Sequence, residues 1–285
     1  MTPMEEHRMT GYKTIEFISD GHLAYLTLNR PERLNALTDE LESEIRSALL
    51  EFDLDDSLWV LIIHGAGRAF CAGVDVKEHS SFSFAVDDAT RQARALAASR
   101  DGHVGGAQHL RGTGGEGWLG RTANYKPVIA AVHGYALGGG AHLAAECDLI
   151  VAAEDARFAI SETTAGMSGS RTWAKIKTFM PTKLASEMLI TGRRVEAAEL
   201  YRHGLINRLV PEGEHLAAAE ALAREVLKAP PLATRDAVRV TRKQWVGLAT
   251  QLDEQMQLSR LDRTEDFREA NRAFAEKRQP EFHAR

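Results

Sequence analysis

Two short segments near the start of the chain alternate between large apolar or β-branched residues and polar ones. They cover Thr14–Ser19 and Leu23–Asn29, and the dipeptide Asp20-Gly21 between them is typical of tight turns. Successive side chains of a strand point to opposite faces, so this alternation suits strands with one buried face. We expect the two segments to form a β-hairpin.

A helical period replaces the alternation after the hairpin. Thr38 precedes it and can accept a hydrogen bond from the first turn, and Asp39 and Glu40 place negative charge where the helix dipole favours it. The pattern predicts a helix over Thr38–Phe52 with one apolar stripe, made of Leu41, Ile45, Leu49 and Phe52.

Three later segments are apolar almost without interruption, which is typical of strands buried on both faces of a parallel sheet. They are Trp59–His64, Pro127–Val132 and Asp148–Ala152, and helical patterns separate them. Strands that alternate with helices favour an α/β fold.

The pattern changes after about residue 212, where helical periods follow one another and Pro230-Pro231 and charged turns interrupt them. We therefore divide the chain into a flexible leader at 1–10, a core at 11–211 and a helical region at 212–285. The helices predicted in the last region are His215–Lys228, Leu232–Trp245, Leu248–Leu261 and Thr264–Glu276.

Composition and charge exclude several classes of protein. The 285 residues are 44% hydrophobic and 26% charged, and their formal net charge of −5 gives no general argument for nucleic-acid binding. Cys71 and Cys147 make neither a disulfide framework nor a metal-ligand motif. No apolar run approaches the roughly 18 residues of a membrane span, and the polar leader is unlike a signal peptide. We expect a cytoplasmic protein without a metal and without a nucleic-acid or membrane partner.

The segment between Asp101 and Gly120 contains eight glycines and little hydrophobic periodicity. One interpretation is a flexible surface loop. The other is a lid or specificity loop whose His103, His109 and Trp118 reach a ligand. The two histidines alone are a poor case for a metal site.

Two glycine-rich turns each follow a buried strand. In the first, Gly65–Asp75, small residues let the backbone turn sharply and leave the N–H of Val74 as a candidate free donor. The second, Gly138–Gly140, precedes a predicted helix over Ala141–Glu146, whose first N–H groups lack intrahelical partners and lie at the positive end of the dipole.

An N–H group from each turn, aimed at one point, would form an oxyanion hole, in which one donor typically contributes about 3–4 kcal/mol of transition-state stabilisation. The alternative is that each turn only lets a strand and a helix pack closely. A nucleotide site is a weaker interpretation, because neither turn matches GxGxxG or GxxxxGK(S/T).

Seven sequence blocks carry a resemblance that spans nearly the whole chain. They are similar, in the same order, to those of the crotonase (enoyl-CoA hydratase/isomerase) superfamily. The blocks are Leu28–Leu37, Ala69–Glu78, Lys126–Gly140, Cys147–Ala152, Phe158–Glu162, Ala197–Val210 and Phe267–Arg278.

The resemblance implies a spiral of ββα repeats followed by a helical region that forms trimers, often paired into hexamers. It implies acyl-CoA thioester substrates of the kind used in fatty acid metabolism, with coenzyme A as part of the substrate and no metal or redox cofactor. The thioester oxygen becomes an enolate-like oxyanion, which the N–H groups of two residues would bind. By motif position these are Val74 and Gly139. The same comparison implies contacts with CoA or the acyl group at Arg33, Ala36, Ala72 and Asp75, and a phosphate-side cation at Lys77.

The acid/base positions are where the chain departs from the family. Hydratases of the family use two glutamates to position and activate water. The second falls on Glu162, but His142 occupies the position of the first. His142 either pairs with Glu162 or holds a water, or it is a neutral, hydrogen-bonded histidine without a proton-transfer role.

Two further departures concern Ser170 and the glycine-rich segment. Ser170 stands where some family members that act on aryl-CoA halides have a carboxylate nucleophile, a role that a serine cannot take. The region between Val74 and Pro127 is longer than is usual in the family. Because this region helps to shape the acyl pocket there, a non-standard acyl group is implied.

The leading hypothesis is an enoyl-CoA hydratase/isomerase-type lyase or isomerase, with Glu162 and His142 as catalytic candidates. The second is a C–C bond hydrolase of the β-diketone type, with His142 as the base on water and no strict need for CoA. The third is an acyl-CoA-binding paralogue that has lost turnover.

Overall fold

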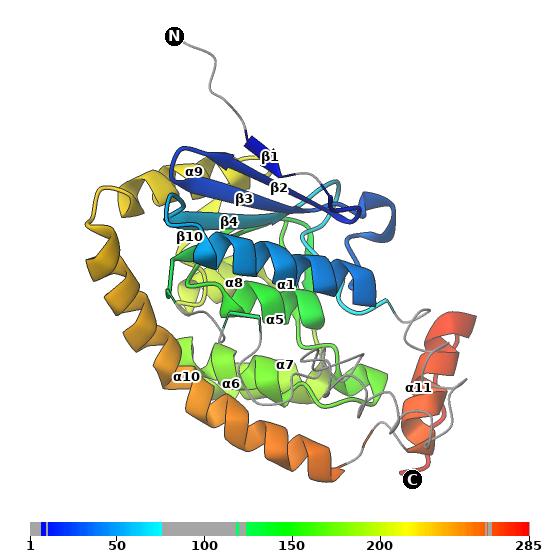
Figure 1. Cartoon of the computed structure of the whole chain (residues 1–285). Helices are drawn as coiled ribbons and strands as arrows, with labels where there is room; N and C mark the ends of the chain where they lie inside the picture. Colours follow the sequence, from blue (N-terminus) through cyan, green and yellow to red (C-terminus); the bar gives the residue numbers. More distant parts are fainter. Residues whose placement is uncertain are drawn as a thin grey trace, which may run out of the picture.

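The computed structural model describes residues 7–9, 11–75, 118–119, 124–259, 261 and 264–284 (Figure 1). Outside these residues lie Lys77, His103, His109 and nearly all of the glycine-rich segment.

A seven-stranded sheet forms the centre of the molecule, in the order β1-β2-β3-β4-β5-β7-β10. The predicted hairpin is confirmed as the antiparallel pair β2 and β3, and every pairing from β3 to β10 is parallel. The strands are β1 (His7–Met9), β2 (Ile15–Asp20), β3 (Leu23–Leu28), β4 (Val60–Gly65), β5 (Val128–Val132), β7 (Leu149–Ala153) and β10 (Arg208–Val210).

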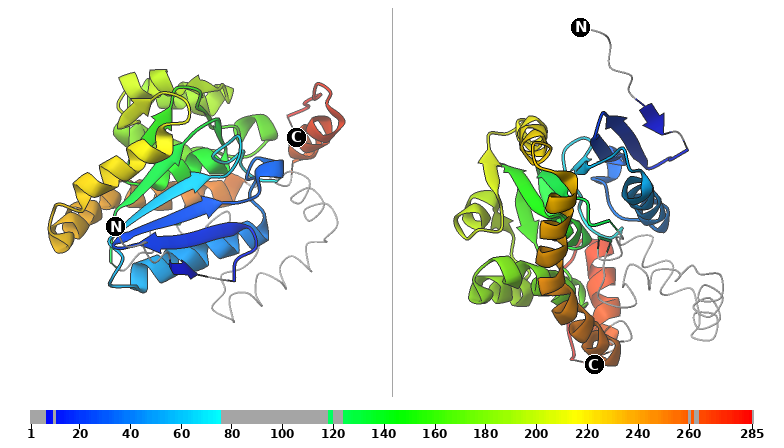
Figure 2. Two further views of the ribbon diagram at one scale, coloured as in Figure 1. Left: turned by 90° about the horizontal axis from the view of Figure 1, so that it is seen from above. Right: turned by 60° about the vertical axis from the view of Figure 1, so that its left-hand side comes forward.

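The predicted buried strands have apolar side chains on both faces of this sheet. In β4, Leu61 and Ile63 belong to the core on one face, whereas Val60 and Ile62 belong to the core on the other. Helices α1 (Asp39–Leu54) and α5 (Gly139–Glu146) lie on the first face and α9 (His215–Val226) on the second (Figures 1 and 2). This two-sided cover explains why these strands are apolar throughout.

Helix α1 has the predicted cap and stripe. The side chain of Thr38 accepts a hydrogen bond from the N–H of Leu41 at 3.2 Å. All four residues of the predicted stripe are buried. The helix continues two residues beyond the predicted end, to Leu54.

A small second sheet connects the central sheet to the remaining helices. It contains β6 (Tyr135–Leu137), β8 (Arg157–Ala159) and β9 (Val195–Glu196). Two 3-10 helices lie at candidate site residues. They are η1 (Pro31–Arg33), which ends at Arg33, and η2 (Thr163–Ala165), which follows Glu162. The later helices are α6 (Ser170–Phe179), α7 (Thr182–Thr191) and α8 (Ala197–Arg202).

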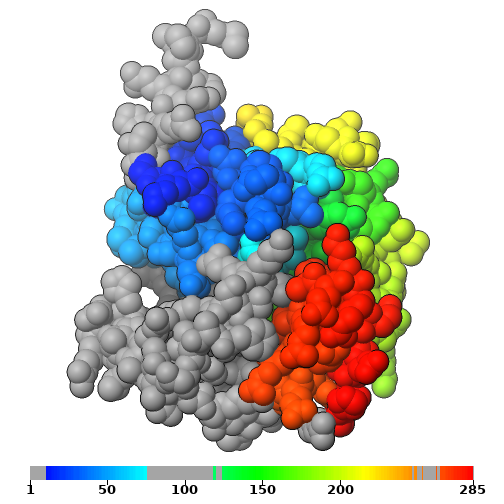
Figure 3. Space-filling model, turned by 90° about the vertical axis from the view of Figure 1, so that its right-hand side faces the viewer, coloured from blue at the N-terminus to red at the C-terminus, as the bar shows by residue number. Residues whose placement is uncertain are grey.

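The helical end of the chain differs in one respect from the sequence prediction. The two helices expected at Leu232–Trp245 and Leu248–Leu261 are one helix, α10 (Pro231–Ser259), which runs through Gly247. One glycine costs a helix only about 1 kcal/mol relative to alanine. The helical turns on both sides of Gly247 therefore join into one helix. The last helix, α11 (Glu265–Glu276), lies at the surface on the side shown in Figure 3.

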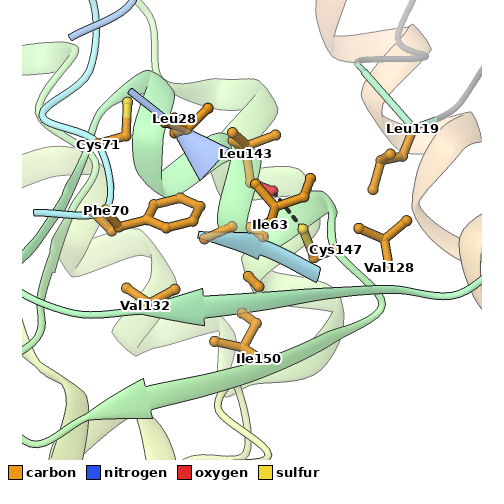
Figure 4. Close-up of a cluster of buried hydrophobic side chains, with 14 of the residues drawn as sticks. Leu28, Ile63, Phe70, Cys71, Leu119, Val128, Val132, Leu143, Cys147 and Ile150 are labelled. Carbon is orange, nitrogen blue, oxygen red and sulfur yellow. Dashed lines mark hydrogen bonds between the residues drawn. The ribbon is translucent and has the colours of Figure 1, made fainter. Parts of the chain in front are cut away.

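The core between the sheet and α5 contains both cysteines (Figure 4). They are free and buried, and the Cys147 thiol donates a hydrogen bond to the carbonyl of Leu143 at 3.4 Å. Within the described residues, no three histidine, cysteine, aspartate or glutamate side chains are arranged to hold a metal ion. None of the described helices is both long and apolar enough to span a membrane.

A buried ion pair fixes α10 to the end of α5. Arg242 Nη2 lies 2.6 Å from Asp148 Oδ2, and the two side chains are 3% and 8% exposed. The guanidinium also donates to the carbonyls of Leu119 and Lys126, at 3.1 and 3.0 Å. One side chain thereby holds three separate segments together.

We expect Arg242→Met to lower the free energy of unfolding by about 3–5 kcal/mol, because it leaves a buried carboxylate without its cation. The measurement is chemical denaturation. Arg239→Met is the matched control on the same helix. Its pair with Asp236 is exposed, so its loss is expected to cost less than about 1 kcal/mol. Equal losses in the two variants would contradict this assignment.

Candidate active site

The two glycine-rich turns predicted from the sequence lie directly against each other. The N–H of Cys71 donates to the carbonyl of Tyr135 at 2.8 Å, and the N–H of Leu137 donates to the carbonyl of Cys71 at 3.0 Å. A Cβ atom at Gly73 would lie only 2.6 Å from the carbonyl oxygen of Leu137. Gly73 also has φ of +90°, so both the contact and the backbone conformation require glycine.

This contact brings Val74 and Gly139 together. A Cβ atom built on Gly139 would lie 3.9 Å from Val74 Cγ2 and 4.0 Å from Gly73 Cα. Gly139 is the first residue of α5, so its N–H has no partner within the helix. Among the described residues, neither of the two N–H groups donates a hydrogen bond. Both residues are half-buried, which leaves their donors available to a ligand.

Glu162 lies beside the second turn. Its backbone carbonyl accepts hydrogen bonds from the N–H groups of Ala165 and Met167, which fixes the start of η2. A Cβ atom at Gly138 would lie 3.7 Å from Glu162 Oε1, and one at Gly169 would lie 3.4 Å from Oε2. The carboxyl group therefore occupies the space between two glycines.

The environment of this carboxyl group favours its neutral form. Oε2 is buried without a hydrogen-bond partner within the described residues. Burial raises the pKa of Glu162 to about 7. A carboxyl group with this pKa can both accept and donate a proton near neutrality, as a general acid/base must.

His142 contacts a different set of groups. Its Nδ1 lies 3.1 Å from the hydroxyl of Thr172, and its Nε2 lies 2.8 Å from Glu146 Oε1 and 3.0 Å from Lys175 Nζ. No hydrogen bond joins it to Glu162 within the part of the chain that the structure describes. Both ring nitrogens are thus engaged, whichever tautomer is present.

The proton affinity of His142 is low. Burial, together with the nearby Lys175 ammonium, lowers the pKa of His142 to about 4. Thr172 does not act as a nucleophile that this histidine activates, because Thr172 is only 1% exposed. The geometry agrees with a neutral, hydrogen-bonded histidine.

The substrate-binding candidates in and before the first turn also converge. Leu37 donates its N–H to the carbonyl of Gly73 at 2.8 Å, and the N–H of Asp75 returns a bond to Leu37 at 2.9 Å. Ala72 donates its N–H to the carbonyl of Leu34 at 3.0 Å. Ala36, Ala72 and Asp75 therefore lie around one stretch of backbone and are half-buried.

Arg33 is exposed on η1, next to this stretch. Lys77 lies outside the described residues, so its place relative to the other candidates stays a prediction. Ser170 begins α6 and accepts a hydrogen bond from the hydroxyl of Ser168 at 3.0 Å.

Sequence reasoning missed several supporting residues. Asn35 is fully buried and donates to the carbonyls of Ala66 and Ala69 at 2.9 and 2.8 Å, which ties the first block to the first turn. Arg30 lies 3.7 Å from Asp75. The spacing of Glu146, four residues after His142 on one helix, was a usable signal. Lys175 gave none, because it comes from another helix.

Comparison with known proteins identifies the family of the chain. A sequence model of the enoyl-CoA hydratase/isomerase family matches residues 97–285, and a second model of the same description matches residues 23–95. The chain belongs to this family. A probable enoyl-CoA hydratase of Mycobacterium tuberculosis is 34% identical to it over 277 residues, which cover 95% of this chain and 98% of the relative.

Other relatives in the family carry more specific names. The 2,3-dehydroadipyl-CoA hydratase of Escherichia coli is 35% identical and covers 91% of this chain and 94% of its own length. The crystal structure of a carnitinyl-CoA hydratase from Mycobacterium avium matches with a TM-score of 0.79, 32% identity and coverage of 96% and 100%. The predicted crotonase-like α/β fold is thereby confirmed, and the protein is an acyl-CoA-processing enzyme of the hydratase/isomerase type.

The raised pKa of Glu162 predicts how stability depends on pH. A carboxyl group whose folded pKa lies above its unfolded value stabilises the protein below pH 4.5 and loses that contribution as pH rises through about 7. We expect Glu162→Gln to be more stable than the parent at pH 8, by at most about 3 kcal/mol, and to lose this advantage at pH 4. Thermal unfolding at both pH values is the measurement. An advantage that does not change with pH would contradict the raised pKa.

Proposed function

We propose that this enzyme isomerises the double bond of an enoyl-CoA, with Glu162 as its single general acid/base. The observation that carries the proposal is the contrast between two side chains. Within the described residues, Glu162 has an unpartnered, buried oxygen and a pKa of about 7, whereas both nitrogens of His142 are hydrogen-bonded to other groups. Isomerisation needs one group that removes a proton from one carbon and returns it to another.

In the proposed mechanism, Glu162 takes a proton from the α-carbon or the γ-carbon of the acyl group. The charge that develops on the thioester oxygen is bound by the N–H groups of Val74 and Gly139. Their proximity and their lack of other partners within the described residues support this role. The positive end of the α5 dipole lies at Gly139 and favours the same charge. The protonated Glu162 then returns the proton to the other carbon.

The substrate would enter with its coenzyme A part near η1. The backbone next to the proposed oxyanion site is flanked by the four candidates for substrate binding, Arg33, Ala36, Ala72 and Asp75. This placement supports their role in binding. Coenzyme A takes part as a portion of the substrate, and the proposed steps use no metal or redox cofactor. We place this reaction in the cytoplasm and in fatty acid metabolism.

A second candidate is hydration of a 2-enoyl-CoA, which the names of the relatives favour. It requires that His142 release a nitrogen to hold the attacking water, or that Glu162 alone activate it. Cleavage of a β-diketone with His142 as the base also requires that the imidazole release a nitrogen from its present partners. An acyl-CoA-binding paralogue without turnover would need no acid/base group.

We expect Glu162→Gln to lower kcat for conversion of a 3-enoyl-CoA to the 2-enoyl-CoA by about 10²–10⁴-fold, because a general acid/base contributes that much. His142→Gln should lower kcat by about tenfold or less. Glu154→Gln is the matched control, because this carboxylate is exposed in the turn before β8. The assays use hexenoyl-CoA isomers and deuterium uptake from D₂O.

The outcomes separate the candidates. Full activity in Glu162→Gln sinks the proposed role of Glu162. Water addition to crotonyl-CoA that fails equally in both variants indicates a hydratase that uses the pair. Turnover of a diketone without CoA indicates a C–C hydrolase, and tight acyl-CoA binding without turnover indicates a paralogue that is not an enzyme.

We also propose that the chain assembles through its C-terminal helices as a homotrimer or a dimer of trimers. Several large apolar side chains of α10 and α11 are exposed, among them Leu232, Val240 and Phe274, at 74%, 55% and 71%. Sedimentation equilibrium should give three or six times the chain mass of 31.4 kDa. Phe274→Glu is expected to shift the population to smaller species, and a monomeric parent would refute the assembly.

A further inference from the structure

A buried charge pair lies directly behind His142 and has no part in the proposed proton transfer. Glu146 is one helical turn further along α5, and Lys175 comes from α6. Their side chains contact each other and are 0% and 1% exposed. Both also reach Nε2 of His142, so one ring nitrogen faces an anion and a cation at the same time.

The carboxylate of Glu146 has partners on both oxygens. Oε1 binds Lys175 and His142, and Oε2 accepts the N–H groups of Trp118 and Leu119 at 2.6 and 2.9 Å. Burial alone would raise the pKa of Glu146, but the Lys175 ammonium and the bond from His142 hold that pKa well below its usual range. These partners favour the carboxylate form of Glu146.

Lys175 is held just as firmly. Its ammonium lies 4.5 Å from the centre of the Trp245 ring, on α10, in addition to its contacts with Glu146 and His142. The pair thus contributes a fixed negative and a fixed positive charge of equal size. The two charges offset each other, so the pair adds no net charge to the surroundings of the imidazole.

The other groups around His142 do not favour protonation of its ring. Arg171 on α6 adds positive charge that opposes protonation, and the ring of Trp118 packs edge-on at 5.5 Å without charge. At the end of α5 the charge of Asp148 is matched by Arg242 on α10. Glu146 is the group that favours an imidazolium, and Lys175 opposes it directly.

We propose that Glu146 and Lys175 are positioning residues. Together they hold the imidazole of His142 in place, and Lys175 offsets the charge of Glu146, so that the buried ring stays uncharged and Glu162 alone exchanges protons at the reacting carbon. The catalytic part of this inference rests on the proposed function. Its structural part concerns the protonation state of His142, which can be measured without turnover.

The inference predicts the effect of each charge separately. Without Lys175, the remaining anion would attract a proton to His142 and form an imidazolium–carboxylate pair. Without both charges, burial alone would keep the imidazole neutral. A pair that serves only the fold would change stability in both cases but would leave the state of His142 unchanged.

The test is an NMR titration of the histidine ring nitrogens, in which the signal lost in His142→Gln identifies His142. Lys175→Met is expected to raise the pKa of His142 by one unit or more from its value of about 4. Lys175→Gln, which can still donate a hydrogen bond to Glu146, gives the same expectation if the methionine variant does not fold. Lys175→Arg should restore the low value. Lys177→Met is the matched control, because Lys177 lies over Trp173 on the same helix.

The double variant Glu146→Gln/Lys175→Gln shows whether the charge of Glu146 causes the raised pKa of His142. It should return the pKa of His142 to within half a unit of the parent, because the anion that attracts the proton is gone. An unchanged pKa of His142 in both Lys175→Met and Lys175→Gln overturns the inference, and so does a raised pKa that persists in the double variant. Full activity of Glu162→Gln would refute the proposed function and leave the titration result standing.

Discussion

The contact between the two glycine turns is the constraint on which the site depends. A Cβ atom at Gly140 would lie 2.2 Å from the carbonyl oxygen of Cys71, and one at Gly73 would meet that of Leu137 at 2.6 Å. Backbone atoms cannot move aside as flexible side chains do, so both positions exclude any larger residue. This close approach sets the spacing of the Val74 and Gly139 amides. Every other group in the site is placed relative to that pair.

Burial then divides the two ionisable groups near these amides into different roles. Glu162 is confined between Gly138 and Gly169 with no cation beside it among the described residues, and burial raises its pKa towards neutrality. His142 lies next to a cation and an anion, and its pKa falls. Groups whose proton affinities are moved in opposite directions are typical of sites with a defined acid/base assignment. Here the opposite shifts leave one group that titrates near pH 7.

The local features of the fold could be predicted from the sequence, because adjacent residues determine them. The β2–β3 hairpin, the Thr38 cap and the two-sided burial of β4 and β5 follow from turn chemistry and periodicity. The position of Glu162 followed from a resemblance between sequence blocks. The contacts of His142 could not be predicted in this way, because Lys175 and Thr172 come from another helix. The continuity of α10 through Gly247 was not predicted, because a single glycine costs a helix too little to end it.

The position of α5 links the buried charges to the proposed oxyanion site. An α-helix of eight residues is about 12 Å long and behaves as a rigid rod. Its first turn is fixed by the contact of Gly140 with Cys71, and its last residue, Glu146, is fixed by Lys175. A carboxylate at a helix C-terminus opposes the helix dipole, so Glu146 needs the ammonium and the two backbone donors that surround it. The ion pair that holds His142 therefore also holds the helix whose first N–H group faces the proposed oxyanion position. Charge and geometry in this site depend on the same two side chains.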